Sequence, residues 1–334
     1  MLNQLKSNKD LGTPGIFLSL TRIPQTERLI VGSSDAHLWE YDFSTPDPKG
    51  LFYGEGHSSY VTGVAWTTGG IVSGAYDGKV IWWDPATRQL IRSIDAHAKW
   101  VRRVHASPDG KIVVSIADDM LAKVWDAGSG KLLHTLGGHE AITPHHYPSM
   151  LYAATFSPDG KLLATGDKIG HIVIWNVDTG EKVTTLESPG MYTWDPKQRR
   201  HSIGGIRSLA FSRDGKTVAV GGVGLINNID HLDGPSRVEL FDWQSGKSLK
   251  VLEDTKFKGL VEQLWFAPHD QWLVTAGGDN AGFVTIYDLA THNIAHQERG
   301  HQHIHALTAN EAGDKLYTAH HGRLMAWSLQ AAMG

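Results

Sequence analysis

The chain contains no cysteine, which excludes disulfide bonds, thiolate zinc sites and cysteine nucleophiles. It also lacks a strong excess of charge of either sign, because 31 Lys and Arg stand against 35 Asp and Glu, a net charge of -4. A protein that grips a nucleic acid backbone along its length is strongly basic, so no nucleic acid partner is expected. No stretch approaches about 18 continuous apolar residues, so no membrane span is expected. The polar segment 1–13 lacks the apolar core of a secretory signal, and we expect a cytoplasmic protein unless a signal has already been removed.

The most regular feature of the 334 residues is an aromatic residue that closes a strand-like run seven times. These residues are separated by 42, 42, 50, 66, 46 and 40 positions. They are Tyr41, Trp83, Trp125, Trp175, Phe241, Tyr287 and Trp327. A repeat of about 40 to 45 residues is typical of one four-stranded sheet, or blade, of a β-propeller. The two long intervals flank the same predicted blade, so one sector of the ring is enlarged.

The turns inside each repeat support this interpretation. The sequence Ser-Pro-Asp-Gly-Lys stands at 107–111 and again at 157–161, and Ser-Arg-Asp-Gly-Lys stands at 212–216. Pro presets φ at the second turn position and Gly supplies a positive φ, which predicts a hairpin between two strands. Four strands joined by short hairpins form one antiparallel blade.

Taken together, residues 14–330 resemble the WD-repeat family of β-propellers, and the similar turns resemble those of bacterial-type members. The resemblance implies that a His, a Ser or Thr, an Asp and a Trp form a hydrogen-bonded tetrad in each complete repeat. Two sets have the expected spacing: His57, Ser73, Asp77 and Trp83, and His97, Ser115, Asp119 and Trp125. Other repeats depart from the pattern. The fourth has Ile169 where the Asp is expected, and the fifth has Val220 and Phe241 at the places of the hydroxyl residue and the Trp.

We therefore predict an all-β fold, a single seven-bladed propeller of four-stranded antiparallel blades that fills one domain, 1–334. Only seven residues follow Trp327, too few for the last outer strand. The N-terminal segment, within 2–11, is expected to supply it and so close the ring. The predicted blades cover approximately 14–43, 51–94, 95–136, 137–187, 188–253, 254–298, and 299–330 plus 2–11.

Three insertions lie in connections that are expected on one face of blades 4 and 5. They are 140–151, 187–203 and 222–236, with about eight, thirteen and eleven extra residues. Aromatic and basic side chains of these loops, and two aromatic residues before inner strands, are candidates for partner binding. The candidates are Tyr60, Trp100, His145, His146, Tyr147, Tyr192, Trp194, Arg199, Arg200 and His231. The alternative is that the loop aromatics only pack the loops onto the propeller.

Histidines in the last repeat suggest a second kind of site. His303, His320 and His321 are weak candidates for a zinc or nickel site. The alternative is that His320 or His321 replaces the missing Asp of its tetrad. No short ligand motif supports a metal, and no cofactor is expected.

No catalytic motif is present, neither a phosphate-binding Gly-Lys-Ser/Thr loop nor a Gly-x-Ser-x-Gly turn. The sequence therefore predicts a non-catalytic interaction scaffold. Its enlarged face at blades 4 and 5 would bind a protein or peptide partner, and a multi-protein complex is one expected setting. The alternative is a small-molecule or metal-dependent activity at the channel mouth, near the histidines of blade 7.

Overall fold

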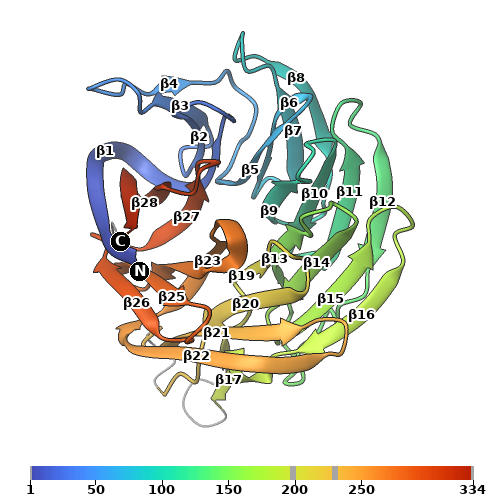
Figure 1. The fold of residues 1–334 in the computed structure, drawn as a ribbon. Coiled ribbons are helices and arrows are strands. Elements are labelled where there is room, and N and C mark those ends of the chain that lie inside the picture. Colours follow the sequence, from blue (N-terminus) through green and yellow to red (C-terminus); the bar gives the residue numbers. More distant parts are fainter. Residues whose placement is uncertain (1, 196–200, 228–231, 332–334) are drawn as a thin grey trace.

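The computed structural model describes residues 2–195, 201–227 and 232–331. Almost every described element is a β-strand, and the sheets surround a central axis like the blades of a propeller (Figure 1). The predicted all-β propeller is confirmed at this level. Within the described residues no helix is long and apolar enough to cross a membrane.

Five of the sheets have four antiparallel strands each. The first comprises β5 (Val61–Thr67), β6 (Gly70–Ala75), β7 (Lys79–Trp83) and β8 (Leu90–Asp95). The second comprises β9 (Val101–Ala106), β10 (Ile112–Ala117), β11 (Leu121–Asp126) and β12 (Leu132–Gly137). The third comprises β13 (Leu151–Phe156), β14 (Leu162–Asp167), β15 (His171–Asn176) and β16 (Lys182–Glu187). The fourth comprises β19 (Ser208–Phe211), β20 (Thr217–Val223), β21 (Pro235–Asp242) and β22 (Lys247–Lys258). The fifth comprises β23 (Leu260–Phe266), β24 (Trp272–Gly278), β25 (Gly282–Asp288) and β26 (Ile294–Arg299).

The remaining propeller sheet has six strands in the order β27-β28-β1-β2-β3-β4. Its strands are β27 (Ile304–Ala309), β28 (Lys315–Ala331), β1 (Leu2–Arg22), β2 (Arg28–Ser33), β3 (Leu38–Asp42) and β4 (Leu51–Phe52). The prediction of seven separate four-stranded blades is therefore wrong, because the described residues form six propeller sheets. The physical reason is that β1 is continuous. It pairs with β28 over 2–16 and with β2 over 17–22, so the first and last predicted blades share one sheet.

The two ends of the chain meet within this sheet. Leu5 pairs with Leu329 and Leu11 pairs with Leu324 in the antiparallel ladder between β1 and β28. Both termini accordingly lie side by side in Figure 1. The predicted pairing of the N-terminal segment with the end of the chain is observed, and it leaves no free edge between the first and last strands.

The predicted hairpin turns follow the inner strands. In the turn at 107–111, Ser107 Oγ lies 2.7 Å from Asp109 Oδ1, and the Ser107 N–H donates to the carbonyl of Ile112 at 2.8 Å. Gly110 has a φ of +70°, as the sequence requires. The same arrangement recurs at 157–161 and at 212–216, so the turn prediction is confirmed.

Apolar side chains fill the space between neighbouring sheets. One cluster joins Val114 and Val124 of one sheet to Leu163 and Trp175 of the next. Each sheet therefore buries both faces, and its middle strands are almost wholly buried. Burial on this scale is the main favourable term that holds the ring together.

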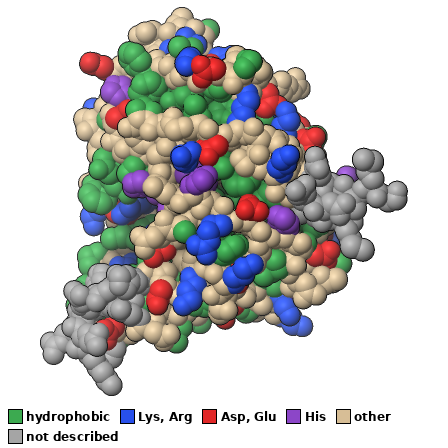
Figure 2. All heavy atoms as spheres, turned by 90° about the vertical axis from the view of Figure 1, so that its left-hand side faces the viewer, with side chains coloured by type: hydrophobic (Ala, Val, Ile, Leu, Met, Phe, Trp, Pro, Cys, Tyr) green, Lys and Arg blue, Asp and Glu red, His purple; other side chains and the backbone are tan. Residues whose placement is uncertain are grey.

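Two short elements stand apart from the propeller sheets. The strands β17 (Tyr192–Asp195) and β18 (His201–Gly204) form a two-stranded ribbon after the one-turn helix η1 (Pro189–Met191). A second one-turn helix, η2 (Pro268–Asp270), replaces the Ser-Pro-Asp-Gly-Lys turn between β23 and β24. On the side of the molecule in Figure 2, basic and acidic side chains are interspersed, in keeping with the balanced composition.

Candidate functional site

The first tetrad is a continuous chain of hydrogen bonds inside the sheet β5–β8. Trp83 Nε1 donates to Ser73 Oγ at 2.8 Å, and Ser73 Oγ lies 2.8 Å from His57 Nε2. His57 Nδ1 lies 3.1 Å from Asp77 Oδ2. An indole N–H only donates, so the Ser hydroxyl donates onward to His57 Nε2, and the proton of His57 sits on Nδ1 facing Asp77. Burial would raise the pKa of Asp77, but the hydrogen bonds from His57 and from the Ser58 N–H hold it below its ordinary value.

The second tetrad repeats this geometry in the sheet β9–β12. Trp125 Nε1 donates to Ser115 Oγ at 3.0 Å, Ser115 Oγ lies 2.8 Å from His97 Nε2, and His97 Nδ1 lies 3.0 Å from Asp119 Oδ2. The His ring tethers the connection before β9 to the middle strands of its own sheet. Satisfied in this way, the polar atoms can be buried without a large penalty.

The sheet β13–β16 contains a third tetrad, whose acidic residue the sequence analysis did not identify. Asp167 Oδ2 lies 2.9 Å from His139 Nδ1, Thr165 Oγ1 lies 2.8 Å from His139 Nε2, and Trp175 Nε1 donates to Thr165 Oγ1 at 2.9 Å. The acid comes two residues after Thr165, whereas it comes four residues after Ser73 and Ser115. Ile169, at the expected place, only donates its N–H to Asp167 Oδ1. A search for Asp at both offsets would have found it.

Asp167 is the most deeply buried of the three acids, with a side chain that has no exposed surface. Burial works to raise its pKa, but hydrogen bonds from His139 and His171 prevail and lower it to about 2. The same contact with Asp167 raises the pKa of His171 above 6.5. A charge held in this way stabilises the loop that precedes β13.

The sheet β19–β22 carries no such tetrad. Val220 and Phe241 lie in an apolar cluster shared with the preceding sheet. A different polar network stands further out, where Ser188 Oγ donates to Glu239 Oε2 at 2.7 Å and Ser248 Oγ donates to Glu239 Oε1 at 2.6 Å. The irregular repeat thus replaces a buried network by apolar packing.

The histidines of the last repeat divide among several roles. His320 has no exposed surface, and its Nε2 lies 2.7 Å from Thr318 Oγ1, which also accepts a hydrogen bond from Trp327 Nε1 at 2.7 Å. His320 therefore takes the place of the loop His, while His301 is exposed and faces Asp10 at 3.2 Å. His303 lies 3.8 Å from Glu262. In the part of the chain that the structure describes, no three His, Asp or Glu side chains are grouped to hold a metal ion.

A row of aromatic rings crosses the end of the propeller at which the connections enter the inner strands. We call Tyr60, Tyr76 and Trp100 the aromatic row. Trp100 stacks on Tyr76 at 4.4 Å between ring centroids and 7° between ring planes, and Tyr60 lies 5.7 Å from Tyr76. Tyr60 and Trp100 are 48% and 50% exposed. Tyr76 was missed by the sequence reasoning, although its place directly before the tetrad residue Asp77 is a signal that could have found it.

The guanidinium of Arg102 packs against two rings of the aromatic row. It lies 5.1 Å from the Tyr76 ring centroid and 5.3 Å from that of Trp100. Two hydrogen bonds to Asp118, at 2.6 and 2.7 Å, fix its orientation. Beside the row is a cavity of about 450 Å³ lined by Trp100, Lys99 and Met150 among others. An exposed ring held by stacking and a bidentate ion pair is a preorganised contact surface.

The first two insertions pack against each other. We call His145, Tyr147, Tyr192 and Trp194 the insertion cluster. The His145 ring stacks on Trp194 at 4.2 Å and 10°, and His145 Nδ1 lies 3.0 Å from the Tyr192 hydroxyl. Tyr147 lies 5.5 Å from Trp194. All four are only partly buried, whereas His146 is exposed and has a φ of +64°.

The third insertion packs beneath the second. The Ile226 N–H donates to Thr193 Oγ1 at 3.2 Å, and Ile226 joins an apolar cluster with Val223 and Leu260. The three insertions thus form one contiguous structure, and Met150 connects it to the cavity beside the aromatic row. Arg199, Arg200 and His231 lie outside the described residues.

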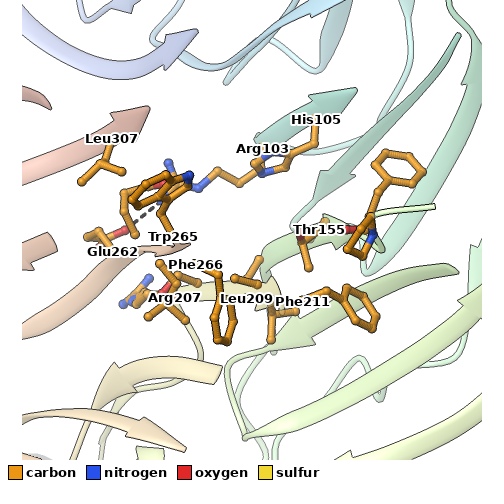
Figure 3. Close-up of a pocket in the computed structure, with 18 of the residues that line it drawn as sticks. Arg103, His105, Thr155, Arg207, Leu209, Phe211, Glu262, Trp265, Phe266 and Leu307 are labelled. Carbon is orange, nitrogen blue, oxygen red and sulfur yellow. Dashed lines mark hydrogen bonds and ion pairs between the residues drawn. The ribbon is translucent and has the colours of Figure 1, made fainter. Parts of the chain in front are cut away.

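The central channel is bridged by an ion pair. Arg103 on β9 donates to Glu262 on β23 at 2.8 Å, and both side chains are about 15% exposed. Figure 3 shows this pair between the strands, at the edge of a cavity that also contains Arg207, Phe211 and Trp265.

A family comparison agrees with this geometry. The family described as WD domain, G-beta repeat matches residues 49–84, 88–126 and 130–176. Each matched segment contains one of the three complete tetrads. These segments are WD40 repeats. The match includes the insertion at 140–151 and ends before the insertion at 187–203.

Several known proteins resemble this chain over part of its length. Eukaryotic translation initiation factor 3 subunit I of Candida albicans is 26% identical over 211 residues, which are 61% of this chain and 53% of that protein. WD repeat-containing protein SL1-17 of Schistosoma mansoni is 25% identical over 221 residues, 66% of this chain and 61% of that protein. Nuclear distribution protein PAC1 of Coccidioides posadasii is 31% identical over 159 residues, 44% and 31% of the two chains.

This chain therefore spans about half of the initiation factor subunit and less than two thirds of the other two proteins. All three come from eukaryotes. The prediction of a bacterial-type member accordingly has no support.

Proposed function

We propose that the chain is a non-catalytic scaffold that binds a protein or peptide partner on the face formed by the aromatic row and the insertion cluster. The observation that carries the proposal is the exposure of Trp100 and Tyr60, each about half exposed, on a rigid support. A folded protein that leaves two large rings exposed over a cavity has a surface suited to a partner.

The insertion cluster supports the same face. Trp194 and Tyr192 keep part of their surface exposed while they stack on His145, so the loops hold their shape without a partner. Less ordering entropy is then lost when a partner binds, because the rings are already fixed. Packing and partner binding are compatible roles for these aromatics.

The names of the relatives point in the same direction. One is named as a subunit of a translation initiation factor, hence as part of an assembly. We propose by analogy that this chain also acts within a multi-protein complex. The cytoplasmic location stays a prediction. The alternative of a small-molecule or metal-dependent activity near the last repeat's histidines is favoured by no specific observation.

Affinity capture with single-residue variants tests the proposed surface. The tagged chain is expressed in its own host, and the captured proteins are quantified by mass spectrometry for the native chain, Trp100→Ala and Trp194→Ala. We expect Trp100→Ala to reduce the main partner at least about tenfold, the loss typical of a binding hot spot. Trp194→Ala is expected to have a smaller effect.

The matched control is Phe52→Ala. Phe52 is 60% exposed but lies on β4, at the outer edge of the six-stranded sheet. It should leave the captured proteins unchanged. If Trp100→Ala and Trp194→Ala capture the same partners in the same amounts as the native chain, this face is not the binding surface.

A further inference from the structure

A second cavity lies at the channel mouth, below the aromatic row. It has a volume of about 220 Å³, and its lining includes Arg102, Arg103, Arg207, Tyr152, Glu262 and His305. These side chains come from or directly precede the inner strands β9, β13, β19, β23 and β27. Three arginines around a space of this size are an unusual concentration of charge.

Two of the three arginines are neutralised. Arg102 forms its bidentate pair with Asp118, and Arg103 pairs with Glu262. Arg207 has no carboxylate within ion-pair distance among the described residues. Its Nε has no exposed surface and no hydrogen-bond partner, and its guanidinium lies 3.8 Å from the Tyr152 ring centroid. Arg207 is therefore a cation that the folded chain leaves uncompensated.

Lys168 is a second buried cation nearby. Its side chain is 7% exposed, and none of the described carboxylates forms an ion pair with it. Burial lowers the pKa of Lys168, and repulsion from Arg207 and Arg102 acts in the same direction, while attraction to Tyr152 and Asp118 opposes the shift. Gly205, which is only two residues before Arg207, packs against the Lys168 backbone. Lys168 is not among the residues that line the cavity, so its charge would act on an anion there only from a distance.

Another lining residue of the cavity offers a further unpaired polar atom. His305 Nε2 is buried and has no hydrogen-bond partner. Burial, with repulsion from His303 and Arg103, lowers the pKa of His305 to about 2, so the ring is neutral and adds no charge. A neutral ring can still donate or accept one hydrogen bond.

We propose that this cavity binds a single oxyanion group, a carboxylate or a phosphate, through Arg207, whose side chain lines it. Removing a cation from water without a counter-charge is costly, so an unpaired arginine in a cavity lined by two further arginines favours an anion there. The guanidinium presents a planar fork of N–H groups that matches an oxyanion. A water molecule in the cavity could satisfy Arg207 Nε, but it would not balance the charge.

Such a group could belong to a free ion or to an acidic or phosphorylated side chain of a peptide that reaches down from the aromatic row. The inference goes beyond the proposed partner surface. Its test uses anion titrations of the purified chain and needs no partner. The anion site and the partner surface can therefore fail independently of each other.

The test is calorimetric titration and thermal melting at constant ionic strength, with chloride as the reference salt. The ligands are inorganic phosphate, acetate, and neutral peptides that contain one Glu, one phosphoserine or neither. We expect at least one oxyanion to bind and to raise the melting temperature. Arg207→Gln should weaken that binding at least about tenfold, since a hydrogen-bonded charge pair is lost, and Arg207→Lys should weaken it less.

Two further variants keep the test decisive. Lys168→Met should raise the melting temperature in chloride, because a buried unpaired charge is removed, and should reduce the rise caused by the anion. Arg92→Gln is the matched control, since Arg92 also stacks on a ring, Trp82, and has a buried unpaired Nη1, but it lies on the outer strand β8. It should not change anion binding.

The outcomes separate the sources of the anion. Tighter binding of a charged peptide than of the free ion assigns the site to a partner side chain, and equal binding assigns it to a free anion. If no oxyanion shifts the melting temperature beyond chloride, or if Arg207→Gln binds as the native chain does, the inference is overturned.

Discussion

Two neighbouring sheets, β13–β16 and β19–β22, solve the same packing problem in different ways. The first buries the tetrad of His139, Thr165, Asp167 and Trp175. In the second, Val220 and Phe241 stand at the places of Thr165 and Trp175 and pack into the shared apolar cluster. Both sheets have four strands with the same antiparallel order.

This difference shows that the polar network is not required to form a sheet of the ring. What both sheets share is a large aromatic side chain on the third strand, buried against the neighbouring sheet. The network instead links the loop before the inner strand to the middle of the sheet. The loop before β13, which keeps the network, carries the insertion at 140–151, and the loop before β19, which lacks it, carries the longer insertion at 187–203.

The largest expected effect tests whether burial of the aromatic side chain stabilises both sheets. Trp175→Ala and Phe241→Ala should each destabilise the chain by about 4 kcal/mol, because each leaves a large cavity in the core. Denaturant unfolding followed by circular dichroism measures both. If Trp175→Ala lowers the unfolding free energy far more than Phe241→Ala does, the hydrogen-bonded network and not the apolar packing stabilises the sheet. The two sheets would then not share a common source of stability.

A smaller effect is expected from the network's buried charge. Asp167→Asn should cost about 2 kcal/mol at pH 7, since a pKa lowered from 3.8 to about 2 corresponds to about 1.4 kcal/mol for each pH unit. The lowered pKa means that this stabilisation is present above pH 4 and is lost as the pH falls toward 2. The unfolding free energies of the native chain and the variant should therefore converge in acid.

The control for this charge is Asp178→Asn, at an exposed turn of the same sheet. It should leave the stability nearly unchanged at every pH. In Asp167→Asn, the pKa of His171 should also return toward 6.5, which NMR titration can follow. A difference between Asp167→Asn and the native chain that persists at pH 2 would mean that Asp167 acts through shape and not through charge.

The smallest stability effect is expected in the insertion cluster. Trp194→Ala should cost about 1 kcal/mol, because it removes one stacking contact between two loops that are only partly buried. Thermal unfolding against the native chain measures it. A loss comparable with that of Trp175→Ala would show that the insertions belong to the core of the fold and are not an added surface.

The sequence predicted the repeat well because its period follows from local chemistry. The Ser-Pro-Asp-Gly-Lys turns and the alternation of apolar strands depend on neighbouring residues, and both recur in the structure. The first two tetrads are hydrogen bonded as their spacing suggests. The third was hidden because the carboxylate reaches His139 from a different backbone position, and sequence spacing does not measure a path through space.

The contacts among the insertions could not be predicted from the sequence either. Their common face followed from the reversal of the chain at each strand, but the stacking of His145 on Trp194 depends on how two loops of different sheets fold. Tyr76 belongs to the candidate surface only because Trp100, from the next repeat, stacks on its ring. Such contacts join residues that share no local pattern.

By itself, the sequence determined that this chain forms an all-β propeller with one enlarged sector and with WD40 repeats at 49–84, 88–126 and 130–176, since period, turn chemistry and strand alternation are local properties. Only the tertiary structure decided that the propeller has six sheets, because a continuous β1 pairs with β28 on one side and with β2 on the other. It also decided which charges find partners. Arg102 meets Asp118 of its own sheet and Arg103 meets Glu262 on β23, while Arg207 meets no carboxylate among the described residues, and the position of a counter-charge across a channel is a property of the closed ring.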